Sequence, residues 1–315
     1  MSQPSAAAPP SGDDAPSTEV LIIGGGPAGL TAATYLARFR RRLVLLDGGQ
    51  SRARWIPTSR NCPGFPLGVE GEQLLERYRQ QARLYGVEPI EAQIARLDKR
   101  GDTFIATAED GRAWQAPIVL LATGVVDRMP AMQGLVKAID GQAVRLCAVC
   151  DGYEASDGDI AVYGPVNEAI RHSLFMRTYS QRVSAVPTDE RAPDADLARQ
   201  ARAAGVRVCA PARALALVDG KAEVTDAQGQ RHRYDTLYPV LGGEVQSALA
   251  LALGAAHDDE HGLRVDPHMQ TSVDGLYAIG DVVSALNQIS VAVGHAAIAA
   301  TAAHNRLPRN LREGD

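Results

Sequence analysis

Several features that would place this chain in a specialised class are scarce or missing. Cysteine occurs four times in 315 residues, too rarely for a small scaffold held together by disulfides. No stretch approaches the roughly 20 consecutive apolar residues that a membrane-spanning helix needs. The 37 acidic residues outnumber the 32 lysines and arginines, so there is no overall basic field to attract phosphate backbones. The sequence therefore predicts neither a membrane span nor a nucleic-acid partner.

The first 17 residues also lack the basic start and apolar middle of a secretory signal. Their proline, alanine, serine and acidic residues are typical of a disordered tail, which we predict for residues 1–17. We therefore expect a cytoplasmic protein. In a reducing compartment a Cys-x-x-Cys pair is more often catalytic or metal-bound than structural, which makes Cys147 and Cys150 the first candidates.

What the chain does contain is typical of α/β proteins. Hydrophobic residues make up 45% and charged residues 22%, with 30 glycines, and the length suits about two domains. Residues 19–47 read as strand, glycine cluster, helix, strand, and the same order begins again at residue 159. The sequence therefore predicts an α/β fold with two dinucleotide-binding (Rossmann-like) domains.

The first glycine cluster has the spacing that a dinucleotide needs. Residues 24–29 read Gly-Gly-Gly-Pro-Ala-Gly. In this pattern Gly24 allows the tight turn, Gly26 lets a pyrophosphate approach the backbone, and Gly29 permits close packing of helix on strand. Asp47 ends the next strand, where a carboxylate accepts hydrogen bonds from ribose. A glycine-rich turn without a ligand is the alternative. Pro27 and Ala28 complete the predicted binding turn.

The pair Cys147 and Cys150 has three interpretations. A structural zinc site needs four ligands, and no second Cys or His pair follows at short spacing, so we predict no metal. Two buried, unreactive thiols are the second interpretation. The third is redox chemistry, in which one thiolate attacks a disulfide and the other resolves the mixed disulfide.

In combination and order, the motifs resemble the low-molecular-weight thioredoxin reductases of the class II pyridine nucleotide-disulfide oxidoreductase fold. Three segments carry the resemblance: Cys-Ala-Val-Cys-Asp-Gly at 147–152, Ala-Thr-Gly at 122–124, and Thr-Ser-Val-Asp-Gly-Leu-Tyr-Ala-Ile-Gly-Asp-Val at 271–282 followed by Asn-Gln and Gly-His-Ala-Ala-Ile-Ala-Ala. Because flavin-site sequence returns after the second strand–helix–strand unit, we infer that the second domain is inserted into the first. The FAD-binding domain is expected at 18–128 and 246–315, and the inserted domain at 129–245. The resemblance also implies a homodimer.

The resemblance implies a role for each matching residue. Cys150 exchanges electrons with FAD, Cys147 attacks the partner disulfide, and Asp151 moves protons for the dithiol. The implied FAD contacts outside the first turn are Gln50, Asn61, Ala122, Thr123, Gly124, Gly280, Asp281, Asn287 and Gln288.

The sequence departs from this family in the inserted domain. Its turn is Gly-Pro-Val-Asn-Glu-Ala at 164–169, with Val166 where a glycine would admit pyrophosphate. The next strand is followed by Asp189 and Glu190 instead of the His and Arg cluster that holds the NADPH phosphate. Losing two charge-assisted hydrogen bonds costs roughly 1.5 to 3 kcal/mol each, or about two to four decades in affinity. The sequence therefore predicts poor NADPH binding, and Val166 argues against tight NADH binding; a shifted loop supplying Arg191 or Arg182 is the alternative.

These observations predict a flavoprotein disulfide oxidoreductase whose nicotinamide half is degraded. In one route a small-molecule or protein dithiol reduces the pair and then FAD, as in relatives that close disulfides in dithiol natural products, which Gly-Tyr-Glu at 152–154 resembles. In another, a thioredoxin-like protein is reduced with electrons from ferredoxin, a second flavin or weakly held nicotinamide. A conventional NAD(P)H-dependent thioredoxin reductase and a non-catalytic FAD-binding redox sensor are the alternatives.

Two further residues invite a functional interpretation. Cys62 takes the place of an aromatic residue common in these reductases; we interpret it as a small apolar filler, with a third redox thiol as the alternative. His295 falls in the helix expected to face the flavin, where either a proton relay or a helix hydrogen bond would suit it.

Overall fold

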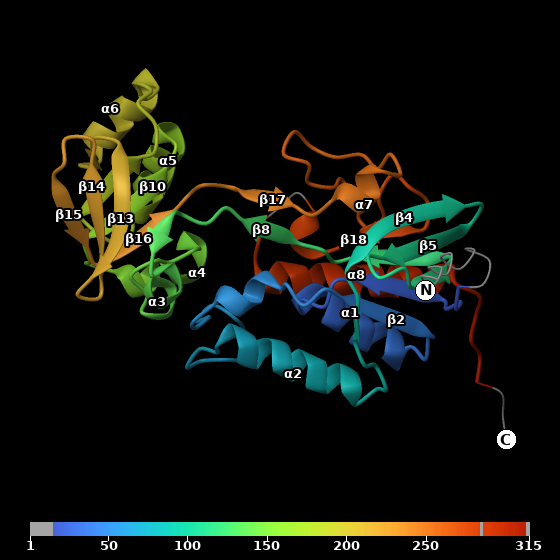
Figure 1. The fold of residues 1–315 in the computed structure, drawn as a ribbon. Helices are drawn as coiled ribbons and strands as arrows, with labels where there is room; N and C mark the ends of the chain where they lie inside the picture. The colour runs from blue at the N-terminus through green and yellow to red at the C-terminus, as the bar shows by residue number, and fades with distance from the viewer. Residues whose placement is uncertain (1–14, 284–285, 313–315) are drawn as a thin grey trace, which may run out of the picture. The chain divides into compact units, whose positions relative to one another are not determined.

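The computed structural model describes residues 15–283 and 286–312. The chain is a mixed α/β protein of two compact units (Figure 1). The first unit holds Met1–Arg54, Gly71–Val126 and Val245–Asp315, and the second holds Trp55–Glu70 and Asp127–Glu244. The second unit is thus inserted into the first, as the sequence predicts. The chain passes between them at β8 (Val125–Asp127) and β17 (Gly243–Val245), which pair with each other.

Two segments differ from the expected boundaries. Trp55–Glu70, expected in the first domain, packs with the second unit, where the Arg60 guanidinium lies 3.7 Å from the Glu154 carboxylate. The predicted disordered tail is the other. Residues 1–14 lie outside the described residues, but Ala15 is buried and its carbonyl accepts a hydrogen bond from the Gln115 side chain at 2.7 Å. Residues 15–18 are therefore tied by hydrogen bonds to Gln115 of the strand β6 (Ala113–Ala116).

The first unit is built on a five-stranded parallel sheet in the order β18-β7-β1-β2-β3. Its strands are β1 (Val20–Ile23), β2 (Leu43–Asp47), β3 (Ile90–Glu91), β7 (Ile118–Leu121) and β18 (Leu276–Ala278). Every residue of β1, β7 and β18 is buried, as expected for parallel strands covered on both faces. Helices α1 (Pro27–Arg38), α2 (Gly71–Arg83) and α8 (Ile289–Arg306) pack together, α1 against both others.

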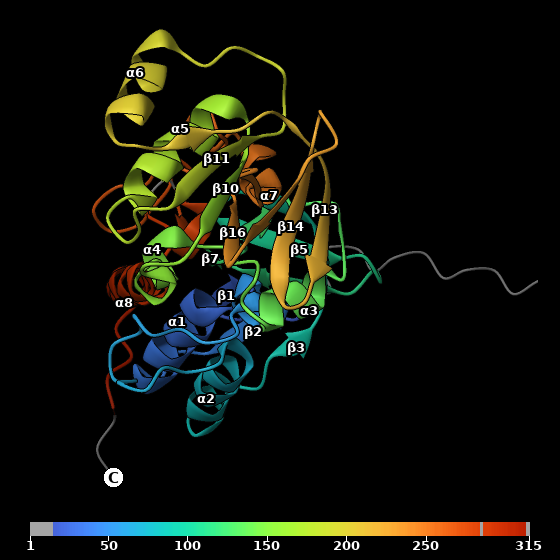
Figure 2. The same cartoon turned by 90° about the vertical axis from the view of Figure 1, so that its left-hand side faces the viewer.

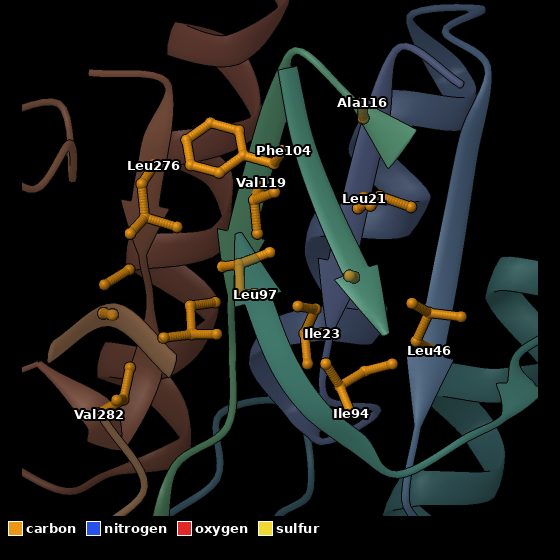
Figure 3. Packing of buried hydrophobic residues seen from close by; sticks show 14 of the residues in the cluster. Leu21, Ile23, Leu46, Ile94, Leu97, Phe104, Ala116, Val119, Leu276 and Val282 are labelled. Carbon is orange, nitrogen blue, oxygen red and sulfur yellow. The ribbon is translucent and has the colours of Figure 1, made fainter. Parts of the chain in front are cut away.

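The opposite side of this core comes from a three-stranded antiparallel sheet. It consists of β4 (Ile94–Arg100), β5 (Thr103–Ala108) and β6 (Ala113–Ala116). Leu97 and Phe104 from this sheet share one buried cluster with Leu21, Val119 and Leu276 from the parallel sheet (Figure 3). The short α7 (Ala248–Leu251) packs against β4. This core fixes the carboxyl ends of β1, β2, β7 and β18 along one edge.

The second unit is also built from a parallel sheet, a second sheet and packed helices. Its parallel sheet has the order β12-β11-β10-β16, formed by β10 (Ile160–Gly164), β11 (Val183–Pro187), β12 (Arg207–Val208) and β16 (Thr236–Pro239). Helix α5 (Val166–Met176) packs on β10 and β11 and also contacts α6 (Ala195–Ala203) (Figure 2). The second sheet contains β9 (Met132–Gln133), β13 (Ala212–Val218), β14 (Lys221–Asp226) and β15 (Arg231–Tyr234). The short helices α3 (Leu135–Asp140) and α4 (Ala148–Asp151) precede β10.

The repeated strand–helix–strand pattern that the sequence predicts is therefore present in both units. Within the described part of the chain, no helix is long and apolar enough to cross a membrane.

Candidate functional site

At two glycines of the turn between β1 and α1, neighbouring backbone atoms leave no room for a side chain. Gly24 has a φ of +111°, and a Cβ there would lie 2.3 Å from the Ala122 carbonyl oxygen. A Cβ on Gly29 would lie 1.8 Å from the Gly24 carbonyl oxygen, far inside van der Waals contact. The geometry thus requires glycine for the tight turn at Gly24 and for close helix packing at Gly29. Pro27 is the first residue of α1, where its missing N–H costs nothing.

Gly26 differs from these two glycines. Its φ of −76° and ψ of −174° suit any residue, and a Cβ there would meet only Ser51 Oγ, at 3.3 Å. Neither backbone strain nor crowding within the chain therefore demands glycine at this position. A ligand that approaches the backbone at the α1 N-terminus would demand it.

Asp47 lies at the end of β2 and is held by the glycine-rich turn. Its Oδ1 accepts hydrogen bonds from the backbone N–H groups of Gly25 at 3.1 Å and Gly49 at 3.0 Å. A Cβ on Gly25 would lie 2.3 Å from Asp47 Oδ2. The carboxylate is thereby fixed beside the turn, where sequence reasoning placed a ribose contact. Gln50, three residues on, is exposed.

The ends of β7 and β18 complete this edge. Ala122 to Gly124 follow β7, and the Thr123 hydroxyl donates a 2.6 Å hydrogen bond to the Gln246 carbonyl. Gly280 has a φ of +72°, and its Cβ position is 3.1 Å from the Ala28 Cβ. The structure therefore brings most predicted first-unit residues to one sheet edge.

Asp281 forms an ion pair that the sequence did not predict. Its Oδ2 lies 3.2 Å from Arg52 Nη1, and both side chains are partly buried. His295, on α8, is electrostatically coupled to Asp281, but burial dominates and lowers the His295 pKa. Its Nδ1 is buried without a hydrogen-bond partner among the described residues. No spacing rule links residues 52, 281 and 295, so only the fold could bring them together.

The remaining predicted FAD contacts lie at the start of α8 and in the second unit. Gln288 is the residue before α8, which begins at Ile289, and Asn287 precedes it. Both are partly buried. Asn61 lies in Trp55–Glu70, the segment that packs with the second unit. It is exposed, and its Oδ1 accepts a hydrogen bond from the Ser59 hydroxyl at 3.2 Å.

Cys147 and Cys150 form a disulfide at the start of α4. Their Cα atoms are 5.3 Å apart, and both residues are partly buried. Cys147 is the N-cap residue of this single-turn helix, and its Sγ accepts a hydrogen bond from the Cys150 N–H at 3.2 Å. Because neither thiol is unpaired, the interpretation of two inert core thiols does not fit. No group of three or more potential metal ligands occurs in residues 15–283 and 286–312.

Asp151 follows Cys150 directly, and both of its carboxylate oxygens are held. Arg145 Nη1 donates to Oδ2 at 3.1 Å, and the Tyr238 hydroxyl donates to Oδ1 at 3.0 Å. Burial raises the pKa of Asp151, while Arg145 and Tyr238 oppose that shift and the negative charge of Glu154 adds to it. Arg145 and Asp151 also line a cavity of about 20 Å³ with Trp55 and Gln142, which is room for about one water molecule. Sequence reasoning found Asp151 but missed both partners.

The other two cysteines, Cys62 and Cys209, are free thiols and are not part of the disulfide. Cys62 is buried, and burial raises the pKa of its thiol, which suits a filler better than a reactive thiolate. Cys209 is partly buried, with its Sγ 3.7 Å from the Tyr234 hydroxyl.

The turn between β10 and α5 differs from the one at β1. The Val166 side chain is 4% exposed and packs with Ala169, Ile170 and neighbouring core residues, so it serves the core of the unit. The Val166 N–H donates to Asp189 Oδ2 at 3.3 Å. Asp189 also pairs with Arg191 at 3.1 Å, and that hydrogen bond lowers the pKa of Asp189. A negative charge therefore stands at the N-terminus of α5.

The loop after β11 is tied to α5 a second time. The Asn167 side-chain oxygen accepts a hydrogen bond from the Asp194 N–H at 3.0 Å. Arg191, the alternative phosphate ligand suggested by the sequence, is paired with Asp189. Arg182, the other alternative, lies 3.5 Å from the Asp159 carboxylate at the opposite end of β11.

Comparison with known proteins agrees with this arrangement. Residues 18–296 match the family model described as pyridine nucleotide-disulphide oxidoreductase. The chain is similar to a thioredoxin reductase of Streptomyces coelicolor, at 30% identity over 84% of this chain and 85% of the relative. It is similar to the crystal structure of HlmI at 28% identity and a TM-score of 0.85, covering 92% of each chain. The thioredoxin reductase structure from Streptococcus pyogenes gives 27% identity and a TM-score of 0.84, covering 92% of this chain and 97% of the other.

Proposed function

Because the chain belongs to the pyridine nucleotide-disulphide oxidoreductase family, we propose that it passes electrons between FAD and a thiol partner through the Cys147–Cys150 couple, without tight dependence on NADPH. It is a flavoprotein disulfide oxidoreductase of the thioredoxin reductase type. The observation that carries the proposal is the contrast between the two helix-start turns. At α1 the Gly26 backbone has no side chain over it, whereas at α5 the first N–H donates to the Asp189 carboxylate.

The first unit fits FAD. The α1 N-terminus and the Gly26 backbone would take the pyrophosphate, because the Cβ that Gly26 lacks is what would fill that approach. Asp47 would accept hydrogen bonds from the adenosine ribose. Asp281, held by Arg52, would contact the ribityl or phosphate region. When bound, FAD supplies a carrier that accepts or gives two electrons.

The second unit does not fit NADPH. A dinucleotide phosphate binds where backbone N–H groups at a helix N-terminus are open to an anion. At α5 the first of these N–H groups already donates to the ionised Asp189. An incoming phosphate would have to displace that carboxylate and tolerate its charge. No step of the chemistry proposed here therefore uses a nicotinamide.

The chain's own residues can carry out the thiol chemistry. A partner thiolate attacks Sγ of Cys147, the disulfide breaks, and Cys150 leaves with the bonding electron pair. The second thiol of the partner then attacks the partner sulfur that is bonded to Cys147. This step releases Cys147 and closes the partner's disulfide. The partner loses two electrons and two protons, and the couple gains the two electrons. The same steps in reverse reduce a disulfide.

The partner is proposed to be a thioredoxin-like protein or a small-molecule dithiol or disulfide. The named thioredoxin reductases among the relatives support the first class. A partly buried couple in a single-turn helix is compatible with either class. We also propose a homodimer, on the strength of the family resemblance alone.

Anaerobic bleaching of the flavin tests the proposal. We expect a dithiol such as dithiothreitol to bleach the flavin band of the FAD-loaded protein, and micromolar NADPH or NADH to leave it nearly unchanged. Cys150→Ser should keep FAD but stop dithiol-driven bleaching, whereas Cys209→Ser, the control, should not. Rapid bleaching by micromolar NADPH would instead establish a conventional reductase. Absence of bleaching by every donor would favour a redox sensor.

A further inference from the structure

The carboxylate of Asp151 accepts hydrogen bonds from two residues that belong to different parts of the chain. Arg145 reaches it from the segment before the cysteine pair, and Tyr238 reaches it from β16. The Tyr238 side chain is among the largest fully buried ones, at 2% exposure or less. Asp151 is therefore held by groups that the surrounding core fixes in place.

Other contacts hold Arg145 in place, so its hydrogen bond fixes the orientation of the Asp151 carboxylate. Its Nη2 donates to the Gln142 side-chain oxygen at 2.6 Å, and its backbone N–H donates to the Leu237 carbonyl at 3.0 Å. The Arg145 side chain is only 11% exposed. A buried guanidinium with a planar fork loses little freedom for each hydrogen bond it forms, so the pair holds one orientation.

We propose that Arg145 and Tyr238 are positioning residues that hold the Asp151 carboxylate in place as the proton-transfer group of the Cys147–Cys150 couple. This inference rests on the proposed function, because it assigns roles within the same dithiol chemistry. It concerns two residues that the family motifs do not include.

The proton balance shows what Asp151 does. When the second partner thiol attacks the mixed disulfide, it must lose its proton, and Asp151 accepts that proton. The sulfur that leaves, Cys147, then receives the proton from Asp151 and becomes a thiol, while Cys150 remains a thiolate. The other partner proton has already gone to solvent when the attacking thiolate formed. Atoms and electrons therefore balance without any further reactant.

Each donor has a distinct effect on this task. The groups that act on the Asp151 charge are Arg145, Tyr238 and Glu154. Arg145 supplies a positive charge that opposes the rise in the Asp151 pKa caused by burial. Tyr238 occupies one lone pair of Oδ1 and fixes the rotamer, and its own pKa is raised by burial and by Asp151, so it stays a donor. Asp151 and Arg145 also line a cavity of about 20 Å³, which has room for about one water molecule beside the carboxylate.

A purely structural role is the competing explanation. The Arg145–Asp151 pair could simply anchor α4 against β16. That role predicts that loss of either donor slows every reaction of the couple equally at all pH values. Positioning for proton transfer predicts a change in the pH profile, because removal of either donor raises the Asp151 pKa further.

The test measures how fast the disulfide of the FAD-loaded protein exchanges with dithiothreitol under anaerobic conditions between pH 5.5 and 9. Acid quenching, alkylation and mass spectrometry give the rate, which is divided by the concentration of dithiothreitol thiolate. The variants are Asp151→Asn, Arg145→Gln, Arg145→Lys and Tyr238→Phe. Arg199→Gln is the matched control, because Arg199 is exposed on α6 in the same unit.

We expect Asp151→Asn to lower the corrected rate about 100-fold near neutral pH. Arg145→Gln and Tyr238→Phe should lower it roughly tenfold near pH 7, as loss of one buried hydrogen bond to a charged group predicts. In both variants the rising limb should move to higher pH and the rate should approach the wild-type rate at high pH. Arg145→Lys should restore part of the loss.

A uniform slowing across the pH range, or profiles identical to that of Arg199→Gln, would overturn the inference. Tyr238→Phe keeps the ring volume and Arg145→Lys keeps the charge, so these two variants decide the matter if Arg145→Gln does not fold. A wild-type disulfide that does not exchange with dithiothreitol would refute the proposed function itself. Normal wild-type exchange with unaltered variant profiles would refute only the positioning roles.

Discussion

Substitution of Gly26 by alanine separates ligand binding from folding. The backbone at Gly26 suits an L residue, and the added Cβ would meet only Ser51 Oγ at 3.3 Å. A serine side chain moves by a few tenths of an ångström at little cost, and replacement of glycine also removes entropy from the unfolded chain, worth about 0.4–1 kcal/mol. We therefore expect the FAD-free protein to change in stability by less than about 1 kcal/mol.

FAD binding should respond very differently. If the pyrophosphate packs against the Gly26 backbone, the methyl group displaces it and weakens charge-assisted hydrogen bonds worth roughly 1.5–3 kcal/mol. That loss corresponds to about a 10- to 150-fold weaker affinity. Titration of the FAD-free protein with FAD, followed by flavin fluorescence, measures the affinity for FAD. Thermal unfolding without FAD measures the change in stability that the substitution itself causes.

Two other glycines calibrate this measurement. Gly294, in α8, has open space around its Cβ position, so Gly294→Ala should keep FAD and gain up to about 1 kcal/mol of helix stability. Gly29→Ala places a Cβ 1.8 Å from a carbonyl oxygen, so it should lose both FAD and stability. Unchanged FAD affinity in Gly26→Ala would show that the pyrophosphate does not lie at this turn.

The remaining predictions concern charge. Burial lowers the His295 pKa, so the unfolded chain takes up this proton more readily than the folded one, and stability should fall as the pH drops below the usual imidazole value of about 6.5. Melting temperatures at pH 7.5 and 5.5 should differ less in His295→Gln than in the wild type; an equal difference would contradict this. Asp189→Asn removes a negative charge from the α5 N-terminus, worth roughly 1 kcal/mol in a solvated setting, and should tighten NADPH binding about fivefold, whereas Asp196→Asn on α6 should leave it unchanged. Equal NADPH binding in the two variants would exclude Asp189 as the obstacle.

Local sequence patterns predicted those parts of the molecule that depend on neighbouring residues. The turn at residues 24–29 and the couple at 147–150 are short motifs whose spacing is set by the backbone itself. Asp47 could be predicted because one helix and one strand of ordinary length separate it from the turn. In each case no more than one helix and one strand connect the important residues.

The parts that escaped prediction depend on packing between distant segments. Tyr238 donates to Asp151 across 87 residues of sequence, and Arg52 pairs with Asp281 across 229. Val166 stands where a glycine would admit a pyrophosphate, and only the structure shows that its side chain fills the core between α5 and its neighbours. The residue type at a turn position cannot distinguish a side chain that obstructs a ligand from one that is buried. The difference depends on the direction in which the Cβ points.

Pro165 offers a physical reason why the two helix-start turns differ. In the first unit Asp47 accepts a hydrogen bond from the N–H of Gly25, the second residue after β1. This carboxylate therefore does not bind the N–H groups at the start of α1. Pro165 stands at the corresponding place in the second unit and has no N–H to donate. The loop carboxylate, Asp189, instead binds the next N–H, that of Val166, which is the first residue of α5. Asp47 is the last residue of β2, whereas Asp189 lies two residues beyond Pro187, the last residue of β11. The second acid therefore reaches the helix N-terminus itself, where its negative charge disfavours an anion.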